Sequence, residues 1–150
     1  MRFAPHMDIA LAEARAAFAR AETPVGAVIV DPAKDRVIAS AGNRTRELHD
    51  PTAHAEMLAI RAACAELGAE RLTGLDIYVT LEPCAMCAAA IAAARLARLC
   101  YGAPDLKSGG VDHGARVFLH PQTHHRPEVY GGIAERESSA LMRAFFAERR

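Results

Sequence analysis

The chain has 150 residues, 18 Lys and Arg against 18 Asp and Glu, and only four cysteines. Its length and its 51% hydrophobic content are typical of one globular domain over residues 1–150, with enough side chains to bury a core. A formal net charge of +0 excludes a strongly basic protein that binds any nucleic acid non-specifically, and it slightly favours a small-molecule partner.

The hydrophobic pattern changes its period several times along the chain. From the N-terminus it predicts a helix over 8–20, a strand over 25–30 with a hairpin partner over 36–41, a helix over 52–67 that ends at Gly68, a strand over 76–81, a helix over 83–95, a strand over 99–102 and a helix over 133–150. The segment 107–132 is rich in Gly, His and Pro and shows no clear period. Helices that alternate with strands indicate an α/β sheet covered on both faces, with functional residues at the strand-to-helix junctions.

The sequence has no pattern of a secretory leader or of a membrane-spanning helix. No basic segment followed by an apolar run stands near the first residue, and the longest apolar stretch, 84–94, is too short to cross a bilayer. We therefore expect a cytoplasmic protein. In a reducing compartment, thiols serve as metal ligands, catalytic groups or core side chains more often than as disulfides.

Residue types that bind metals gather at two of the predicted strand-to-helix junctions. Cys84 and Cys87 are three residues apart, so both sulfurs lie on one face at the start of a helix and can hold one ion. His54, at the start of the preceding helix, adds a nitrogen ligand. Three protein ligands leave one position of a tetrahedral Zn²⁺ open for water, which indicates a catalytic site rather than a structural one.

Glu56 is the candidate proton carrier of this site. It follows His54 by two residues. At about 100° per residue the two side chains leave a regular helix on nearly opposite sides, so Glu56 is poorly placed to bind the same ion. Its long side chain can still reach a water on the metal, which suits a general acid and base.

Each motif also has a plainer interpretation. The pair Cys84 and Cys87 alone is compatible with a thioredoxin-like redox site, because such pairs also stand at helix N-termini. A zinc finger could pair these cysteines with His120 and His124, but the gap between the two pairs is much longer than the about 12 residues usual in such fingers. The remaining cysteines, Cys64 and Cys100, fit the core as small hydrophobic side chains.

Together the motifs resemble the signature of the zinc deaminases, in which His-x-Glu is followed by Pro-Cys-x-x-Cys. The likeness extends over nearly the whole chain, to bacterial tRNA-specific adenosine deaminases, and it is carried by the segments 24–28, 42–44, 50–56, 78–87, 101–103 and 145–150. The resemblance implies a three-layer α/β/α fold of the cytidine deaminase type, with a central mixed sheet of about five strands. It also implies a homodimer.

The resemblance implies an activity and a role for each residue of the two motifs. His54, Cys84 and Cys87 are expected to bind Zn²⁺, and Glu56 is expected to move protons between a zinc-activated water and the substrate. The implied reaction is hydrolysis of adenosine to inosine at the wobble position of a tRNA anticodon.

Two further residues are expected to contact the extruded nucleoside. Asn43 resembles the family's residue that hydrogen-bonds the flipped base, although an Asn after Gly42 is also a common turn former. Asp105 resembles a residue that faces the ribose, whereas the residue by itself suggests a solvated loop carboxylate.

The end of the chain offers candidate contacts to the anticodon loop. Phe145 and Phe146 cannot both face one core from adjacent helix positions, so one ring is free to meet a nucleobase while the other faces inward, although ordinary core packing explains them as well. Arg149 and Arg150 suit phosphate contacts, unless they belong to a frayed, solvated terminus.

Some positions depart from the family pattern. Pro104, His124 and the segment 109–121 differ from what the resemblance leads us to expect, and they lie near the presumed RNA surface rather than the metal site. They leave open a deaminase of a free base or nucleotide, such as guanine or cytosine, on the same scaffold. A third possibility is a non-catalytic protein with structural zinc, against which the presence of Glu56 argues, because a structural site needs no proton carrier.

Overall fold

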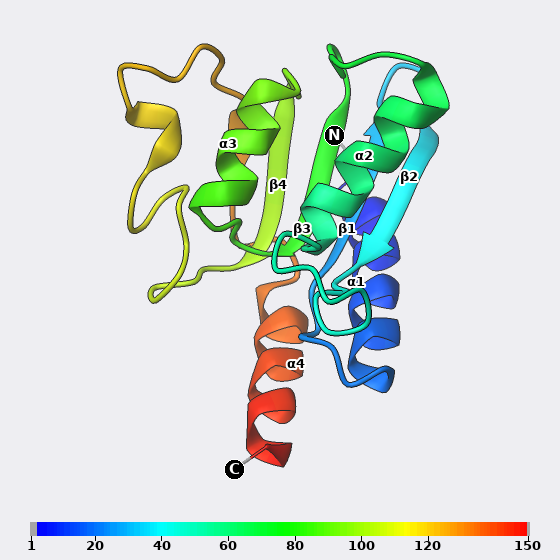
Figure 1. Cartoon of the computed structure of the whole chain (residues 1–150), viewed down its shortest axis with the longest axis vertical. Coiled ribbons are helices and arrows are strands. Elements are labelled where there is room, and N and C mark those ends of the chain that lie inside the picture. The colour runs from blue at the N-terminus through cyan, green and yellow to red at the C-terminus, as the bar shows by residue number, and fades with distance from the viewer. Residues whose placement is uncertain (1–2, 150) are drawn as a thin grey trace.

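The computed structural model describes residues 3–149 and shows a β-sheet between two layers of helices (Figure 1). In chain order the elements are α1 (Ala4–Ala19), β1 (Gly26–Asp31), β2 (Arg36–Gly42), α2 (Ala55–Leu67), β3 (Asp76–Leu81), α3 (Ala85–Ala93), β4 (Arg98–Ala103), the short 3-10 helix η1 (Val117–Leu119), β5 (Glu128–Tyr130) and α4 (Glu135–Glu148). None of the helices within 3–149 has the length and apolar character that crossing a membrane requires.

The sheet is mixed, and its strands follow the order β2-β1-β3-β4-β5. β1 is antiparallel to both of its neighbours, which confirms the predicted hairpin, whereas β3, β4 and β5 are parallel. β5 lies in the segment for which no element was predicted. It is three residues long and pairs at the edge, with Leu99 opposite Val129, so local hydrophobic periodicity could not reveal it.

Alternation along the strands divides the core into two parts. One set of buried side chains contacts α1: Val28, Val30, Tyr78 and Cys100. The other set contacts α2 and α3: Ala27, Ile29, Ile77 and Val79. The predicted sheet with helices on both faces is therefore confirmed, and Cys100 is a buried core side chain as expected. Cys64 is partly buried against the larger core.

The starts of α2 and α3 position the candidate metal ligands. Both helices begin two or three residues later than the pattern predicts. In the first case Asp50 accepts hydrogen bonds from the backbone N–H and the hydroxyl of Thr52, at 2.8 and 2.7 Å, and this turn delays the helix. His54 and Cys84 are consequently the N-cap residues, in extended conformation, and α2 ends at Gly68 with φ 61° as predicted.

Gly26 sets how closely β1 approaches α1. A Cβ at this position would lie 1.9 Å from the carbonyl oxygen of Ala10, a backbone atom that cannot rotate away. We expect Gly26→Ala to lower the free energy of unfolding by more than about 3 kcal/mol. Gly68→Ala meets no atom within 4 Å and carries only the strain of its positive φ, so about 1 kcal/mol is expected. Urea unfolding at one fixed zinc concentration measures both, and equal losses in the two variants would contradict this role of Gly26.

Candidate metal centre

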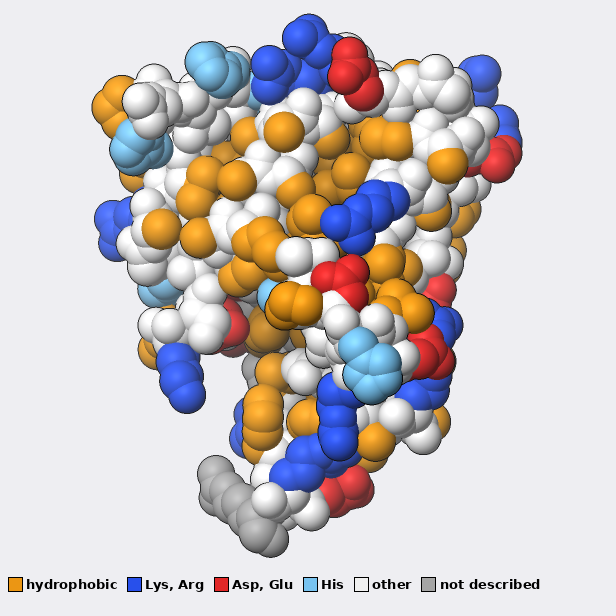
Figure 2. Space-filling model, in the orientation of Figure 1, with side chains coloured by type: hydrophobic (Ala, Val, Ile, Leu, Met, Phe, Trp, Pro, Cys, Tyr) orange, Lys and Arg blue, Asp and Glu red, His pale blue; other side chains and the backbone are white. Residues whose placement is uncertain are grey.

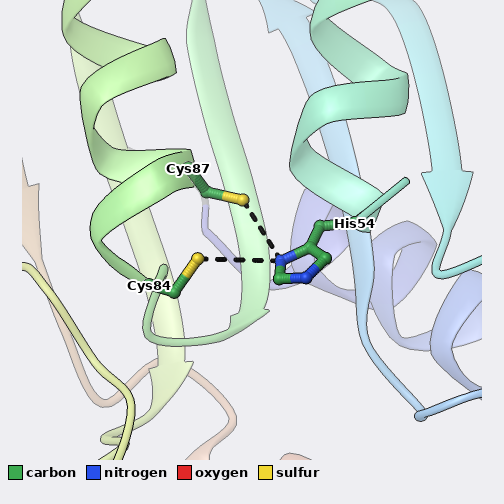
Figure 3. Close-up of side chains that lie close together, drawn as sticks. All are labelled: His54, Cys84 and Cys87. Atoms are coloured by element: carbon green, nitrogen blue, oxygen red, sulfur yellow. Dashed lines mark hydrogen bonds between the residues drawn. The ribbon is translucent and has the colours of Figure 1, made fainter. Parts of the chain in front are cut away.

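The N-termini of α2 and α3 lie side by side, and the side chains of His54, Cys84 and Cys87 point toward one another from them (Figure 3). The Nδ1 atom of His54 lies 3.7 Å from the Sγ atom of Cys84 and 3.5 Å from the Sγ atom of Cys87. The structure thus brings together the three residues that sequence reasoning selected as ligands, although α2 and β3 lie between His54 and the two cysteines along the chain.

The spacing of these atoms fits zinc. Bond lengths of about 2.3 Å to sulfur and 2.05 Å to nitrogen, at a tetrahedral angle, place the two kinds of ligand atom about 3.6 Å apart. All three atoms lie within 4.8 Å of one another, and this is the one such group of His, Cys, Asp or Glu side chains among residues 3–149. A donor set of two sulfurs and one nitrogen is typical of Zn²⁺ and leaves a fourth position open.

The surroundings already favour the ligand form of one thiol. A hydrogen bond with Cys87 lowers the pKa of Cys84 to about 4, although burial acts the other way, and a weaker effect of His54 adds to it. The same contact raises the pKa of the buried Cys87, since one thiol donates to the other's thiolate. A bound dication deprotonates both thiols. The hydrogen bond with Cys84 likewise raises the pKa of His54, so proton release on metal binding is expected from both Cys87 and His54.

Glu56 stands beside the ligands in the first turn of α2 and is only 4% exposed. Burial raises the pKa of its carboxyl group, and the nearby His54 and a hydrogen bond with Cys87 partly oppose this effect. A carboxyl with a raised pKa holds a proton more readily near neutral pH, which is what a group that both takes and gives a proton needs.

The metal centre opens into a pocket of about 220 Å³. This volume is smaller than the about 300–1,000 Å³ of pockets that hold drug-sized ligands, so it suits a single flat ring system rather than a whole nucleotide. Five lining residues were selected from the sequence: Asn43, His54, Glu56, Cys84 and Asp105. The others were not: Thr23, Val25, Thr45, Leu81, Glu82 and Ser108.

Asn43 is 6% exposed and is fixed in the pocket wall by a second buried side chain. Its Nδ2 donates to the Oε1 atom of Glu22 at 3.3 Å and to the hydroxyl of Thr45 at 3.2 Å. Glu22, itself 1% exposed, also accepts the backbone N–H groups of Arg46 and Glu47. Sequence reasoning missed Glu22, because a lone charged residue between a helix and a strand carries no local signal of this network.

Asp105 lines the same pocket from the opposite loop. Its Oδ1 accepts the backbone N–H groups of Lys107 and Ser108, at 3.1 and 2.9 Å, so one carboxylate oxygen shapes its own turn. Glu82, the other acidic residue of this wall, was also missed. The available signal was a charged residue at the end of an otherwise buried strand, directly before Pro83.

Of the two adjacent aromatic residues of α4, one is buried and the other is exposed, as their helical spacing predicts. Phe145 is 4% exposed and its ring lies 5.7 Å from that of Phe18, whereas Phe146 is 49% exposed. Phe146 lines a groove that adjoins the pocket, together with Lys107 and Arg143 among others. The contact of Phe146 with a nucleobase stays a prediction.

The side chain of Arg149 folds back onto the helix that precedes it. Its guanidinium lies 3.4 Å from the centre of the Phe145 ring, and Nη1 donates to the carbonyl oxygen of Phe145 at 3.1 Å. The predicted phosphate contact of Arg149 stays a prediction, and Arg150 lies outside the described residues.

Comparison with known proteins agrees with this geometry. Residues 4–103 match the family described as the cytidine and deoxycytidylate deaminase zinc-binding region. The chain belongs to this deaminase family. The cofactor expected from the sequence, Zn²⁺, is thereby supported both by the family and by the arrangement of His54, Cys84 and Cys87.

Individual relatives of the deaminase are named for an RNA substrate. The chain is 59% identical to the tRNA-specific adenosine deaminase of Agrobacterium fabrum, over 96% of this chain and 93% of the relative. It is 39% identical to the protein of the same name from Bacillus subtilis, over 97% and 89%. Relatives of this kind cover nearly the whole sequence, as the resemblance implied.

Solved structures confirm the three-layer fold. One from a study of A-to-I editing by tRNA:A34 deaminases at the wobble position is 57% identical and superposes with a TM-score of 0.90, over 93% of this chain and 99% of that one. The guanine deaminase of Bacillus subtilis is 31% identical, with a TM-score of 0.67, over 99% and 94%.

The ligand assignment of the deaminase can be tested by metal content. We expect His54→Ala and Cys87→Ala to lose most of the about one zinc ion per chain that a single three-ligand site holds. Cys64→Ala is the matched control, because Cys64 is a partly buried cysteine far along α2 from the ligands, and it should keep its zinc. Atomic emission on dialysed protein gives the measurement, and full occupancy in either ligand variant would refute that ligand.

Proposed function

We propose that the chain is a zinc-dependent hydrolase that converts adenosine to inosine at the wobble position of a tRNA anticodon. The observation that carries this proposal is the metal centre at the base of a pocket sized for one base, which adjoins a groove lined by Phe146, Lys107 and Arg143. Similarity over nearly the full length to tRNA-specific adenosine deaminases adds support.

The reaction replaces the exocyclic amino group with oxygen from water and releases ammonia. Zinc, when held by His54, Cys84 and Cys87, supplies a water that ionises near neutral pH. Glu56 takes the proton of that water and delivers it to N1 of the adenine ring. It then takes the second proton of that water, left on the new C6 hydroxyl, and gives it to the amino group, which departs as ammonia. The burial that raises the pKa of Glu56 helps it hold each proton between these transfers.

Polar side chains around the pocket orient the nucleoside in this proposal. Asn43 bonds the edge of the base, and the ties to Glu22 and Thr45 keep its amide from rotating. Asp105 accepts a ribose hydroxyl. Because these groups are already held in place, little conformational entropy is lost when the base enters.

The neutral total charge is compatible with an RNA substrate. Figure 2 shows Lys and Arg side chains gathered on the lower part of the molecule, beside α4. An enzyme that reads one extruded base needs only such a local basic surface for the neighbouring phosphates. The candidates are Arg143, which lies on α4 and lines the groove, and Arg149, which directly follows α4.

The proposal includes the assembly and the location of the enzyme. We take residues 1–150 as one catalytic domain, supported by the single sheet and its two adjoining core clusters. A homodimer is supported by the hydrophobic area over α2 and α3 in Figure 2. Modification of tRNA is consistent with a cytoplasmic protein.

A deaminase of free guanine is the second candidate. The observation in its favour is the structural similarity to the guanine deaminase of Bacillus subtilis, and a pocket for one base also suits a free base. The exposed Phe146 and the cationic groove favour the RNA substrate, because a free base has no neighbouring phosphates or bases to meet them.

Paired assays separate the two candidates. We expect inosine to form in an anticodon stem-loop with adenosine at the wobble position, at a kcat/KM at least about a thousandfold above that for ammonia release from free guanine, cytosine or adenine. A stem-loop with adenosine only at another loop position is the control. Turnover of guanine together with an inert stem-loop would overturn the tRNA assignment.

The role of Glu56 gives a second test. We expect Glu56→Gln to keep its zinc and its fold but to lose kcat by more than the about 10²–10⁴ that a typical acid or base supplies, because one group serves both proton transfers. Glu66→Gln, which alters an exposed carboxylate near the far end of α2, is the control and should change kcat little. An active Glu56→Gln enzyme would remove Glu56 from the mechanism.

A further inference from the structure

Glu82 is a buried carboxylate to which the proposed reaction gives no part. It directly follows β3 and precedes Pro83, and its residue is 2% exposed, with the side chain fully covered. A carboxylate is retained in such a place only when hydrogen bonds replace the water that it has lost. Its partners therefore indicate what the residue is for.

Five donors surround this carboxylate, and all of them belong to the segment 105–113. Oε1 accepts the backbone N–H of Asp105 at 3.1 Å and lies 2.7 Å from Nδ1 of His113. Oε2 accepts the backbone N–H groups of three consecutive residues, at 2.9 to 3.1 Å: Val111, Asp112 and His113. Glu82 thus bonds both ends of the segment.

The segment passes so close to Glu82 that position 109 has room only for glycine. A Cβ on Gly109 would lie 2.7 Å from Oε2 of Glu82 and 2.4 Å from the carbonyl oxygen of Asp105. Gly110 donates its N–H to the carbonyl oxygen of Pro83 at 2.8 Å, so the segment also touches the turn that leads to Cys84.

This segment forms one wall of the pocket and has no helix of its own. Asp105 and Ser108 line the pocket from it, and 104–116 contains no helix or named strand. We propose that Glu82 is a positioning residue. It holds the wall 105–113 against the metal-ligand turn, and it thereby sets how well the substrate binds rather than how fast protons move. The substrate named in its test rests on the proposed function.

Glu82→Gln tests this role with almost no change of shape. A carboxamide has one acceptor oxygen and an NH₂ group, so in either orientation the NH₂ faces at least one backbone N–H that now has no acceptor. We expect the wall to loosen while zinc content stays at that of the unmodified chain. KM for the stem-loop should rise by about tenfold or more with kcat changed by less than about threefold.

Amide hydrogen exchange reports on the wall without any substrate. The N–H groups of Asp105, Val111, Asp112 and His113 should exchange at least about tenfold faster in Glu82→Gln, while those of β3 stay protected. Asp76→Asn is the matched control. Asp76 is a buried carboxylate at the other end of β3, with Oδ1 at 3.6 Å from Nε of Arg98, so it should change stability but neither KM nor exchange in 105–113.

If Glu82→Gln does not fold, Gly109→Ala disturbs the same contact from the side of the wall and should give the same rise in KM and in exchange. Unchanged exchange at the four amides in whichever variant folds, or a loss confined to kcat, would overturn the positioning role. A stem-loop that the unmodified chain does not deaminate would instead refute the proposed function, and the exchange result would still decide the role of Glu82.

Discussion

The close approach of α2 and α3 to the sheet is the constraint on which the rest of the molecule depends. The buried side chains of these helices are mostly alanines, among them Ala59, Ala63, Ala88 and Ala92. Small side chains let both helices lie near the sheet and near each other, so their first residues meet with ligand atoms 3.5 and 3.7 Å apart. The alanine bias of the sequence is thus a condition for the metal site.

The helix caps show what this arrangement costs. N-cap positions favour Ser, Thr, Asp or Asn, whose side chains bond the free backbone N–H groups. Here the caps are His54 and Cys84, and neither makes such a bond. The two side chains instead point toward each other as metal ligands, so both helices lack the stabilisation of a side-chain N-cap. Zinc binding offsets this loss of stability, because an ion that binds only the folded chain stabilises the fold.

Sequence reasoning found the parts of the site that are encoded locally. Cys84 and Cys87 share a turn, and His54 and Glu56 lie within three residues, so spacing alone indicated a metal and a proton carrier. Sequence reasoning missed features whose interaction partners are distant along the chain. β5 is defined by its pairing with β4, 30 residues earlier, and the donors to Glu82 lie 23 to 31 residues further along the chain. The late start of α2 was missed because a side chain, Asp50, stabilises the preceding turn.

The charges around the pocket bear on the kind of substrate that can enter. Glu56, Glu82 and Asp105 all line it, so a phosphate placed inside would lie close to acidic groups in a poorly screened space. Hydrogen bonds from the wall hold the pKa of Glu82 low although burial acts the other way, which keeps one of these charges in place down to acidic pH. A free nucleotide has to bring its phosphate near this site. In an RNA loop, by contrast, the flanking phosphates can remain in the adjoining groove, where Lys107 and Arg143 carry the opposite charge, while the base alone enters.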